Sequence, residues 1–166
     1  MRIALLLALV LLVAPAASAG VGVGERAPAF TLPDRAGREV ALADLRGKVV
    51  CLDFWATWCG SCKRALPALD ALARRPEHAG VRFVAVSVDR DRELAEKWLA
   101  QHLPDTALTL LHDPEAATLA RFGAGGMPAL FLIDAEGIVR HVESGYTADA
   151  LPRIERALAA LVETRQ

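Results

Sequence analysis

The sequence lacks an excess of charge of either sign, because 19 lysine and arginine residues are balanced by 20 aspartate and glutamate residues. Nucleic-acid binding depends on a surplus of cations that contact phosphates, so this balance argues against a nucleic-acid partner. Linkers, internal repeats and low-complexity stretches are absent as well. Residues 20–166 are therefore expected to form one domain around a single hydrophobic core, and to act as a monomer.

A long apolar run is also missing. The apolar stretch near the N-terminus covers only residues 3–14, whereas a membrane-spanning helix needs about 20 residues. Arg2 precedes this stretch and a triplet of small residues follows it at 17–19, which is typical of a secretory signal peptide. We expect residues 1–19 to be a signal peptide cleaved before Gly20, which in a bacterium indicates a periplasmic protein. The short run disfavours a retained membrane anchor, and no cysteine follows it to carry a lipid.

Cysteine is scarce, with three in the chain. Two of them, Cys59 and Cys62, have a spacing that suits a redox dithiol, a zinc site or haem attachment. Haem attachment is excluded, because it needs a histidine directly after the second cysteine and Lys63 stands there. A purely structural disulfide is disfavoured, because a bridge across so short a loop restrains little chain entropy. We expect the third cysteine, Cys51, to be a small buried residue with an inert thiol.

Apolar periodicity predicts alternating strands and helices. Strands are expected as a hairpin within 29–42, at 49–54, 81–88 and 108–111, and as a second hairpin formed by 129–133 and 138–142. Helices are expected at 62–74, 91–103, 113–122 and 149–162. This order indicates an α/β fold in which a mixed sheet carries helices on both faces.

Three of the helices have distinctive sequence signals. Pro67 should kink the first of them. The second should be capped by Asp91 and should pack through Leu94, Trp98 and Leu99. The third should open at Asp113-Pro114 and close at Gly123.

The cysteine pair follows an apolar strand and opens a helix, where unpaired backbone N–H groups and the helix dipole favour a thiolate. We expect Cys59 to be the nucleophile and Cys62 the resolving thiol, which attacks Cys59 to release a reduced partner. Asp53 is the candidate proton acceptor, because burial within an apolar strand should raise the pKa of its carboxyl group. The alternative is that a nearby lysine neutralises Asp53. Trp58 suits either core packing or an apolar docking surface.

Further motifs surround the pair: Gly24-Glu-Arg-Ala-Pro-Ala-Phe30, Leu45-Arg-Gly-Lys-Val-Val50, Pro67, and Gly126-Met127-Pro128 before a strand. With the Trp-Cys-x-x-Cys run, they make residues 20–166 resemble the exported TlpA/ResA-like branch of the thioredoxin-like superfamily. The resemblance implies a thioredoxin-like fold with an N-terminal β-hairpin and an inserted helix and strand within 89–111. It also implies a cis peptide bond at Pro128 beside the dithiol.

The resemblance further implies a periplasmic thiol reductant of disulfide-bearing exported proteins, apocytochrome c among them, recharged by a membrane-embedded thiol donor. No cofactor or metal is expected beyond the Cys59/Cys62 disulfide itself. Contact with the partner is expected at Trp58, Gly60, Ser61, Met127 and Pro128, where the backbone of Met127 pairs with the substrate chain like an added strand.

One departure from the branch is Ala65, which stands where many members carry a glutamate, three residues after the second cysteine. This weakens the assignment to cytochrome c maturation. Asp53 matches the buried aspartate of ordinary thioredoxins, and we expect it to compensate for the missing glutamate.

Other functions use the same residues or the same fold. A disulfide oxidase or isomerase would differ only in a less reducing couple. A peroxiredoxin-like peroxidase is disfavoured by Ala56, which replaces the hydroxyl residue found three positions before the peroxidatic cysteine. A metal-binding module would need His78, His102, His112 or His141, and none of these lies in a metal-binding motif.

Overall fold

A computed structural model describes residues 20–164. The expected signal peptide, residues 1–19, lies outside the described residues. Within 20–164, no helix combines the length and the apolar character that crossing a membrane would require.

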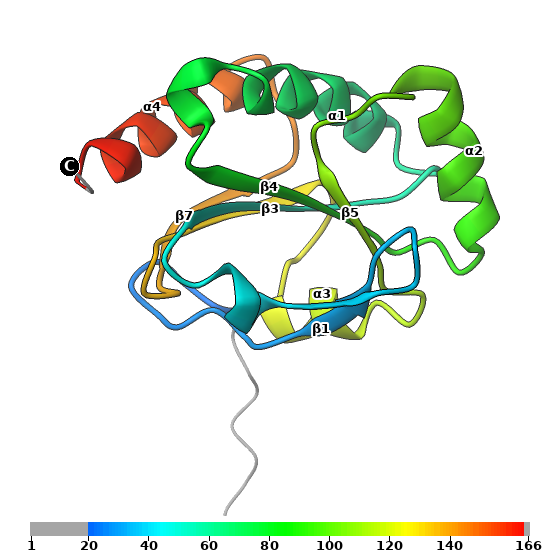
Figure 1. The fold of residues 1–166 in the computed structure, drawn as a ribbon, viewed down its shortest axis with the longest axis horizontal. Helices are drawn as coiled ribbons and strands as arrows, with labels where there is room; N and C mark the ends of the chain where they lie inside the picture. The colour runs from blue at the N-terminus through cyan, green and yellow to red at the C-terminus, as the bar shows by residue number, and fades with distance from the viewer. Residues whose placement is uncertain (1–19, 165–166) are drawn as a thin grey trace, which may run out of the picture.

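The core of the molecule is a five-stranded sheet with the strand order β5-β4-β3-β6-β7 (Figure 1). Its strands are β3 (Val49–Trp55), β4 (Val81–Ser87), β5 (Thr109–His112), β6 (Ala129–Ile133) and β7 (Val139–Ser144). The pairs β3/β4 and β4/β5 are parallel, whereas β3/β6 and β6/β7 are antiparallel. Every residue of β3 and β6 is buried, as expected for strands covered on both faces. The predicted mixed sheet is confirmed.

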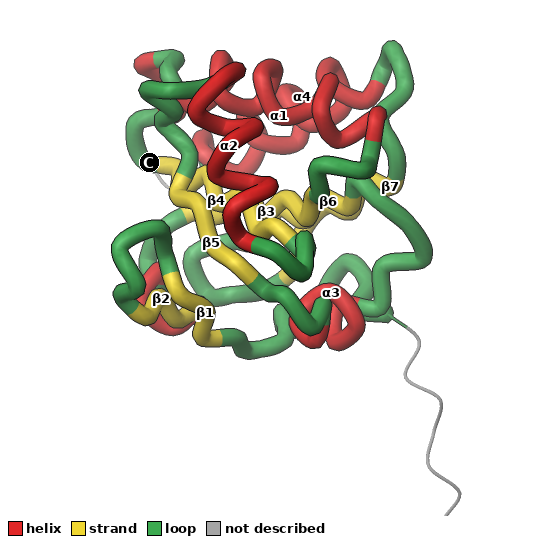
Figure 2. The backbone as a smooth tube through the Cα atoms, turned by 90° about the vertical axis from the view of Figure 1, so that its right-hand side faces the viewer, coloured by secondary structure: helices red, strands yellow, loops and turns green. Residues whose placement is uncertain are grey.

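Helices cover both faces of this sheet, as predicted (Figure 2). One side carries α1 (Gly60–Ala73), α2 (Arg92–His102) and α4 (Ala150–Glu163), and the other carries α3 (Ala117–Phe122) with the hairpin of β1 (Thr31–Pro33) and β2 (Glu39–Ala41). Short 3-10 helices lie at η1 (Leu42–Leu45) and η2 (Pro76–His78). The hairpin and the inserted α2–β5 segment confirm the thioredoxin-like architecture with both of its expected additions.

The helix predicted for 113–122 begins later than expected. Ala116 has a left-handed φ of 51°, and its N–H donates to the Asp113 carbonyl at 2.9 Å, so a turn replaces the first expected helical residues. The Asp113 carboxylate still accepts hydrogen bonds from the N–H groups of Ala117 and Thr118. Gly123 ends the helix with a φ of 65°, as predicted.

The prediction for α2 is correct at its start and wrong for one of its packing residues. Asp91 caps the helix by accepting a hydrogen bond from the Glu93 N–H at 2.9 Å. Leu94, however, is 53% exposed, and the buried face consists of Ala95 and Leu99. These two residues are four positions apart, so they lie on the same side of the helix.

Candidate active site

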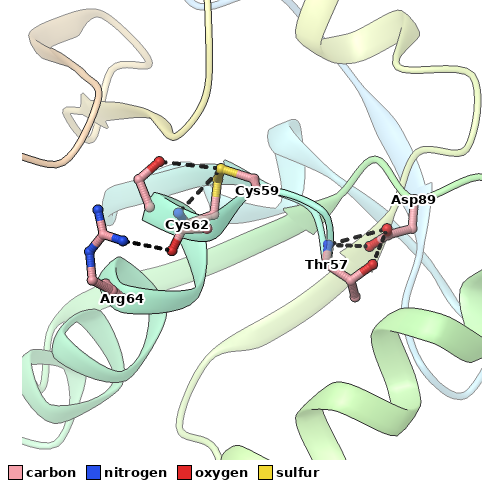
Figure 3. The surroundings of a disulfide bond; sticks show 7 residues. Thr57, Cys59, Cys62, Arg64 and Asp89 are labelled. Atoms are coloured by element: carbon pink, nitrogen blue, oxygen red, sulfur yellow. Dashed lines mark hydrogen bonds between the residues drawn. A yellow bond between two sulfur atoms is a disulfide. The ribbon is translucent and has the colours of Figure 1, made fainter.

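The two cysteines lie where β3 gives way to α1, and they form a disulfide with a Cα–Cα distance of 5.3 Å (Figure 3). Cys59 is the N-cap of α1, and its Sγ accepts a hydrogen bond from the Cys62 N–H at 3.2 Å. The Ser61 hydroxyl lies 3.5 Å from the same sulfur. After reduction, a thiolate on Cys59 would therefore face the positive end of the helix.

The two sulfurs differ in their access to solvent. Cys59 is 8% exposed, whereas Cys62 is fully buried. A partner protein can therefore reach Cys59 more readily than Cys62, which agrees with the order of attack expected from the sequence. Gly60 is exposed and Ser61 is partly exposed beside Cys59.

The loop before β6 lies beside Trp58, the residue that precedes Cys59. The peptide bond between Met127 and Pro128 is cis, as the resemblance implied. Met127 lines a surface groove together with Trp58 and Leu94. Trp58 is 69% exposed, so core packing is the wrong interpretation for this side chain, and its role in an apolar docking surface stays a prediction.

Asp53 lies in the middle of β3 and is 2% exposed. Both of its carboxylate oxygens are buried without a hydrogen-bond partner in the part of the chain that the structure describes. Its neighbours in the adjoining strands are Ala85 and Leu130. The alternative of a neutralising lysine is therefore wrong for residues 20–164, and burial raises the pKa of Asp53 well above its usual value.

Cys51 occupies the same strand and is 1% exposed. Burial, and next the charge of Asp53, raise the pKa of the Cys51 thiol well above its usual value. The expectation of a buried thiol outside the disulfide is confirmed.

Asp89 is a buried residue of the site that the sequence analysis missed. It is 1% exposed and follows the carboxyl end of β4. Its carboxylate accepts hydrogen bonds from the Thr57 N–H at 3.0 Å and the Thr57 hydroxyl at 2.7 Å (Figure 3), and another from the Ser87 hydroxyl at 2.9 Å. The carboxylate thus holds the loop that leads into Cys59. The sequence offers one signal for Asp89, namely its position just after a buried strand, because functional side chains gather at the carboxyl edge of such sheets.

Among the described residues, no three histidine, cysteine or acidic side chains gather into a group that could hold a metal. Three of the histidines considered above engage the backbone instead, among them His102, whose Nδ1 lies 2.8 Å from the Trp98 carbonyl. His78 Nδ1 lies 3.0 Å from the Leu72 carbonyl, and His112 Nε2 lies 2.7 Å from the Asp89 carbonyl.

The arrangement suits thiol–disulfide exchange, because it combines an accessible sulfur at a helix start, a buried second sulfur and a buried carboxyl group.

Comparison with known proteins points the same way. The model of the AhpC/TSA family matches residues 23–142. The thiol-disulfide oxidoreductase ResA of Geobacillus thermodenitrificans is 37% identical over 125 residues, which cover 75% of this chain and 71% of that protein. ResA of Geobacillus kaustophilus is 35% identical over 125 residues, with the same coverage of 75% and 71%.

Among solved structures, one from Chlorobium tepidum is described as a candidate thiol:disulfide interchange protein DsbE. It superposes with a TM-score of 0.80 at 35% identity, over 86% of this chain and 99% of its own. The family match spans most of the chain, and the relatives share both its sequence and its fold. The chain therefore belongs to the AhpC/TSA family and is a thiol–disulfide oxidoreductase of the ResA type.

Proposed function

We propose that this protein is a periplasmic reductant that transfers two electrons from the Cys59/Cys62 dithiol to disulfides of exported proteins. The surroundings of Cys59 carry the proposal. Its sulfur has two neutral neighbours, the Cys62 N–H and the Ser61 hydroxyl. Strong oxidants of this chemistry stabilise their reduced form, which retains the thiolate. Apart from the start of α1, this sulfur has no cationic hydrogen-bonding partner among the described residues, and neutral partners stabilise a thiolate less than a cation does, which favours a reducing couple.

The first step is attack of the Cys59 thiolate on one sulfur of the partner disulfide. A bond forms between Cys59 and that sulfur, the partner's own disulfide breaks, and its second sulfur leaves as a thiolate that takes a proton from water. Trp58 and Met127 line the groove beside Cys59 and contact the partner chain during this step. Gly60, Ser61 and Pro128 complete the contact surface.

The second step releases the partner. Asp53, as a carboxylate, takes the proton of the Cys62 thiol, and the Cys62 thiolate attacks the Cys59 sulfur. The disulfide between Cys59 and Cys62 forms, and the partner's sulfur leaves as a thiolate. A raised pKa suits Asp53 to this task, because a group that titrates nearer to neutral pH can both accept and release a proton. A membrane-embedded dithiol donor then reduces the pair again.

The test is the reduction potential of Cys59/Cys62 in the Cys51→Ser variant, equilibrated against defined thiol buffers. A value at or below about −270 mV, the potential of thioredoxin, is expected for a reductant. A value above about −180 mV would overturn the proposal in favour of an oxidase or isomerase.

A second measurement identifies the partners. The Cys62→Ser variant should accumulate mixed disulfides at Cys59, because the second step is blocked. Apocytochrome c is the first partner to test, since reductants of this branch act on it. Its absence among the trapped proteins would remove cytochrome c maturation while leaving the reductant role intact.

A further inference from the structure

A second buried acid lies in the same row of the sheet as Asp53. Asp53 on β3 is in register with Leu130 on β6, and Leu130 is in register with Glu143 on β7. Residues paired across strands project from the same face, so both carboxyl groups point to the side covered by α1 and α4. Neighbouring strands are about 4.8 Å apart, which places the two backbones roughly 9–10 Å from each other.

Between these acids lies a small cavity of about 10 Å³. Its lining includes Asp53, Glu143, Pro128, Tyr146 and Ala65. Ala65 is the residue that replaces the glutamate found in many members of the branch, and its short side chain leaves this space open. The volume is close to what one water molecule needs.

Asp53 supplies an independent reason to place a water there. Its two carboxylate oxygens are buried without a partner among the described residues. A buried polar group without a hydrogen bond is costly, and a water in an adjoining polar cavity satisfies it. Glu143 offers the second hydrogen-bonding group that such a water requires.

Glu143 is 7% exposed and is held firmly. Arg153 of α4 donates to its two oxygens, at 2.6 Å through Nη2 and 3.0 Å through Nε. His141 Nε2 lies 3.3 Å from the same carboxylate. The hydrogen bonds from Arg153 keep the pKa of Glu143 below its usual value, so Glu143 is ionised when Asp53 titrates.

We propose that Glu143 holds a water against Asp53 and that the Glu143–Arg153 pair controls how readily Asp53 takes the proton of Cys62. In this arrangement, a carboxylate from β7 performs the task of the glutamate missing at Ala65. The proposal rests on the role given to Asp53 in the proposed function. Glu143 and Arg153 are positioning residues, because they act on the sulfur only through Asp53.

The physical mechanism is the local charge balance. Arg153 pairs with both Glu143 and Asp149, so these three side chains together carry one net negative charge. Removal of the Glu143 charge takes away the anion that lines the cavity beside Asp53, which favours the Asp53 carboxylate. Loss of the Arg153 charge leaves the Glu143 anion, which favours the protonated acid.

Several other groups lie around Asp53 or contact the Glu143–Arg153 pair. Cys51 shares its strand, Cys62 lies on α1, and β4 and β6 contribute only Ala85 and Leu130. His141 contacts Glu143, Asp149 pairs with Arg153, and Tyr146 borders the cavity. None of these groups is altered in the two variants, so the two shifts should have opposite signs.

The experiment is a carboxyl ¹³C NMR titration of Asp53 in the oxidised protein, with the signal assigned by its loss in Asp53→Asn. Glu143→Gln should move the midpoint to lower pH and Arg153→Gln to higher pH, each by on the order of 0.5–1 pH unit. Arg153→Lys retains the charge and should stay near the wild-type midpoint. Glu155→Gln is the matched control, because Glu155 lies on the same helix and pairs instead with Arg75.

Shifts in the same direction, or midpoints equal to the wild type in both variants, would overturn this inference. If one variant fails to fold, the other still tests the proposal, because a direction is predicted for the shift of the Asp53 midpoint in each variant. The role of Asp53 is tested separately by the pH profile of mixed-disulfide release. An unchanged profile in Asp53→Asn would remove Asp53 from the mechanism, whatever its titration midpoint.

Discussion

Asp89 accepts three hydrogen bonds from Thr57, two from its N–H at 3.0 and 3.2 Å and one from its hydroxyl at 2.7 Å. The two residues lie at the ends of neighbouring parallel strands, 32 positions apart in the sequence. The active-site loop is therefore anchored to β4 two residues before Cys59. This anchor orients Trp58 and Cys59 without touching either sulfur.

Loss of the Asp89 charge should loosen this anchor. We expect Asp89→Asn to lower the free energy of unfolding by about 1–3 kcal/mol, because hydrogen bonds to a buried charged acceptor are strong. In the variant, the side-chain NH₂ group of asparagine replaces one carboxylate oxygen and faces the Thr57 N–H, from which it cannot accept a hydrogen bond. Urea unfolding measures the change. Thr57→Val removes only the hydroxyl bond and should cost about 1 kcal/mol. A smaller loss in Asp89→Asn than in Thr57→Val would show that the carboxylate is not the main anchor.

The burial of Asp53 predicts a pH-dependent stability. Its pKa is raised above the usual 3.8, so the folded protein holds this proton more tightly than the unfolded chain does. The contribution of Asp53 to the free energy of unfolding is therefore fully present at pH values below the pKa that Asp53 has in the unfolded chain. It is lost as the pH rises toward the pKa that Asp53 has in the folded protein. Asp53→Asn, which cannot ionise, should become more stable than the wild type above about pH 4, by up to about 1.4 kcal/mol per pH unit across that window.

Urea titrations of both proteins between pH 4 and pH 8 measure this difference. Effects of the other ionisable groups cancel in the comparison, since both proteins contain them. A difference that does not change with pH would contradict a raised pKa at Asp53.

The exposure of Trp58 predicts an effect on partner binding alone. Trp58→Ala should raise the KM for a protein disulfide by about tenfold, because exposed tryptophans in a groove frequently dominate an interface. The rate with a small disulfide and the free energy of unfolding should stay near the wild-type values. Val23→Ala is a suitable control, because Val23 is 64% exposed and does not line the groove. Equal losses with protein and small disulfides would place Trp58 in the chemistry and not in docking.

Ala56 predicts weak reactivity with peroxide. Its side chain is buried three positions before Cys59 and has no hydroxyl group to hydrogen-bond a peroxide oxygen. Reduced protein should consume hydrogen peroxide no faster than an ordinary reactive thiol, as followed by loss of peroxide in the presence of a thiol reductant. Rapid consumption that disappears in Cys59→Ser would instead establish a peroxidase.

Local signals in the sequence determined most of the fold. The strand of 49–54, the cysteine pair at a helix start and the turn at 134–137 are all recognisable from neighbouring residues, and each is present in the structure. The cis bond before Pro128 followed from the resemblance, because a local sequence does not distinguish cis from trans. Local signals misplaced the start of α3, where the left-handed Ala116 interrupts the expected pattern.

The sequence by itself thus determined the fold class and the two sulfurs. Only the tertiary structure decided what surrounds them: Asp53 has no lysine partner among the described residues, Asp89 anchors Thr57, and Glu143 faces the space left by Ala65. These relationships join strands through their register and join the sheet to the helices above it. Each depends on contacts between residues far apart in the chain, which hydrophobic periodicity and turn signals do not encode.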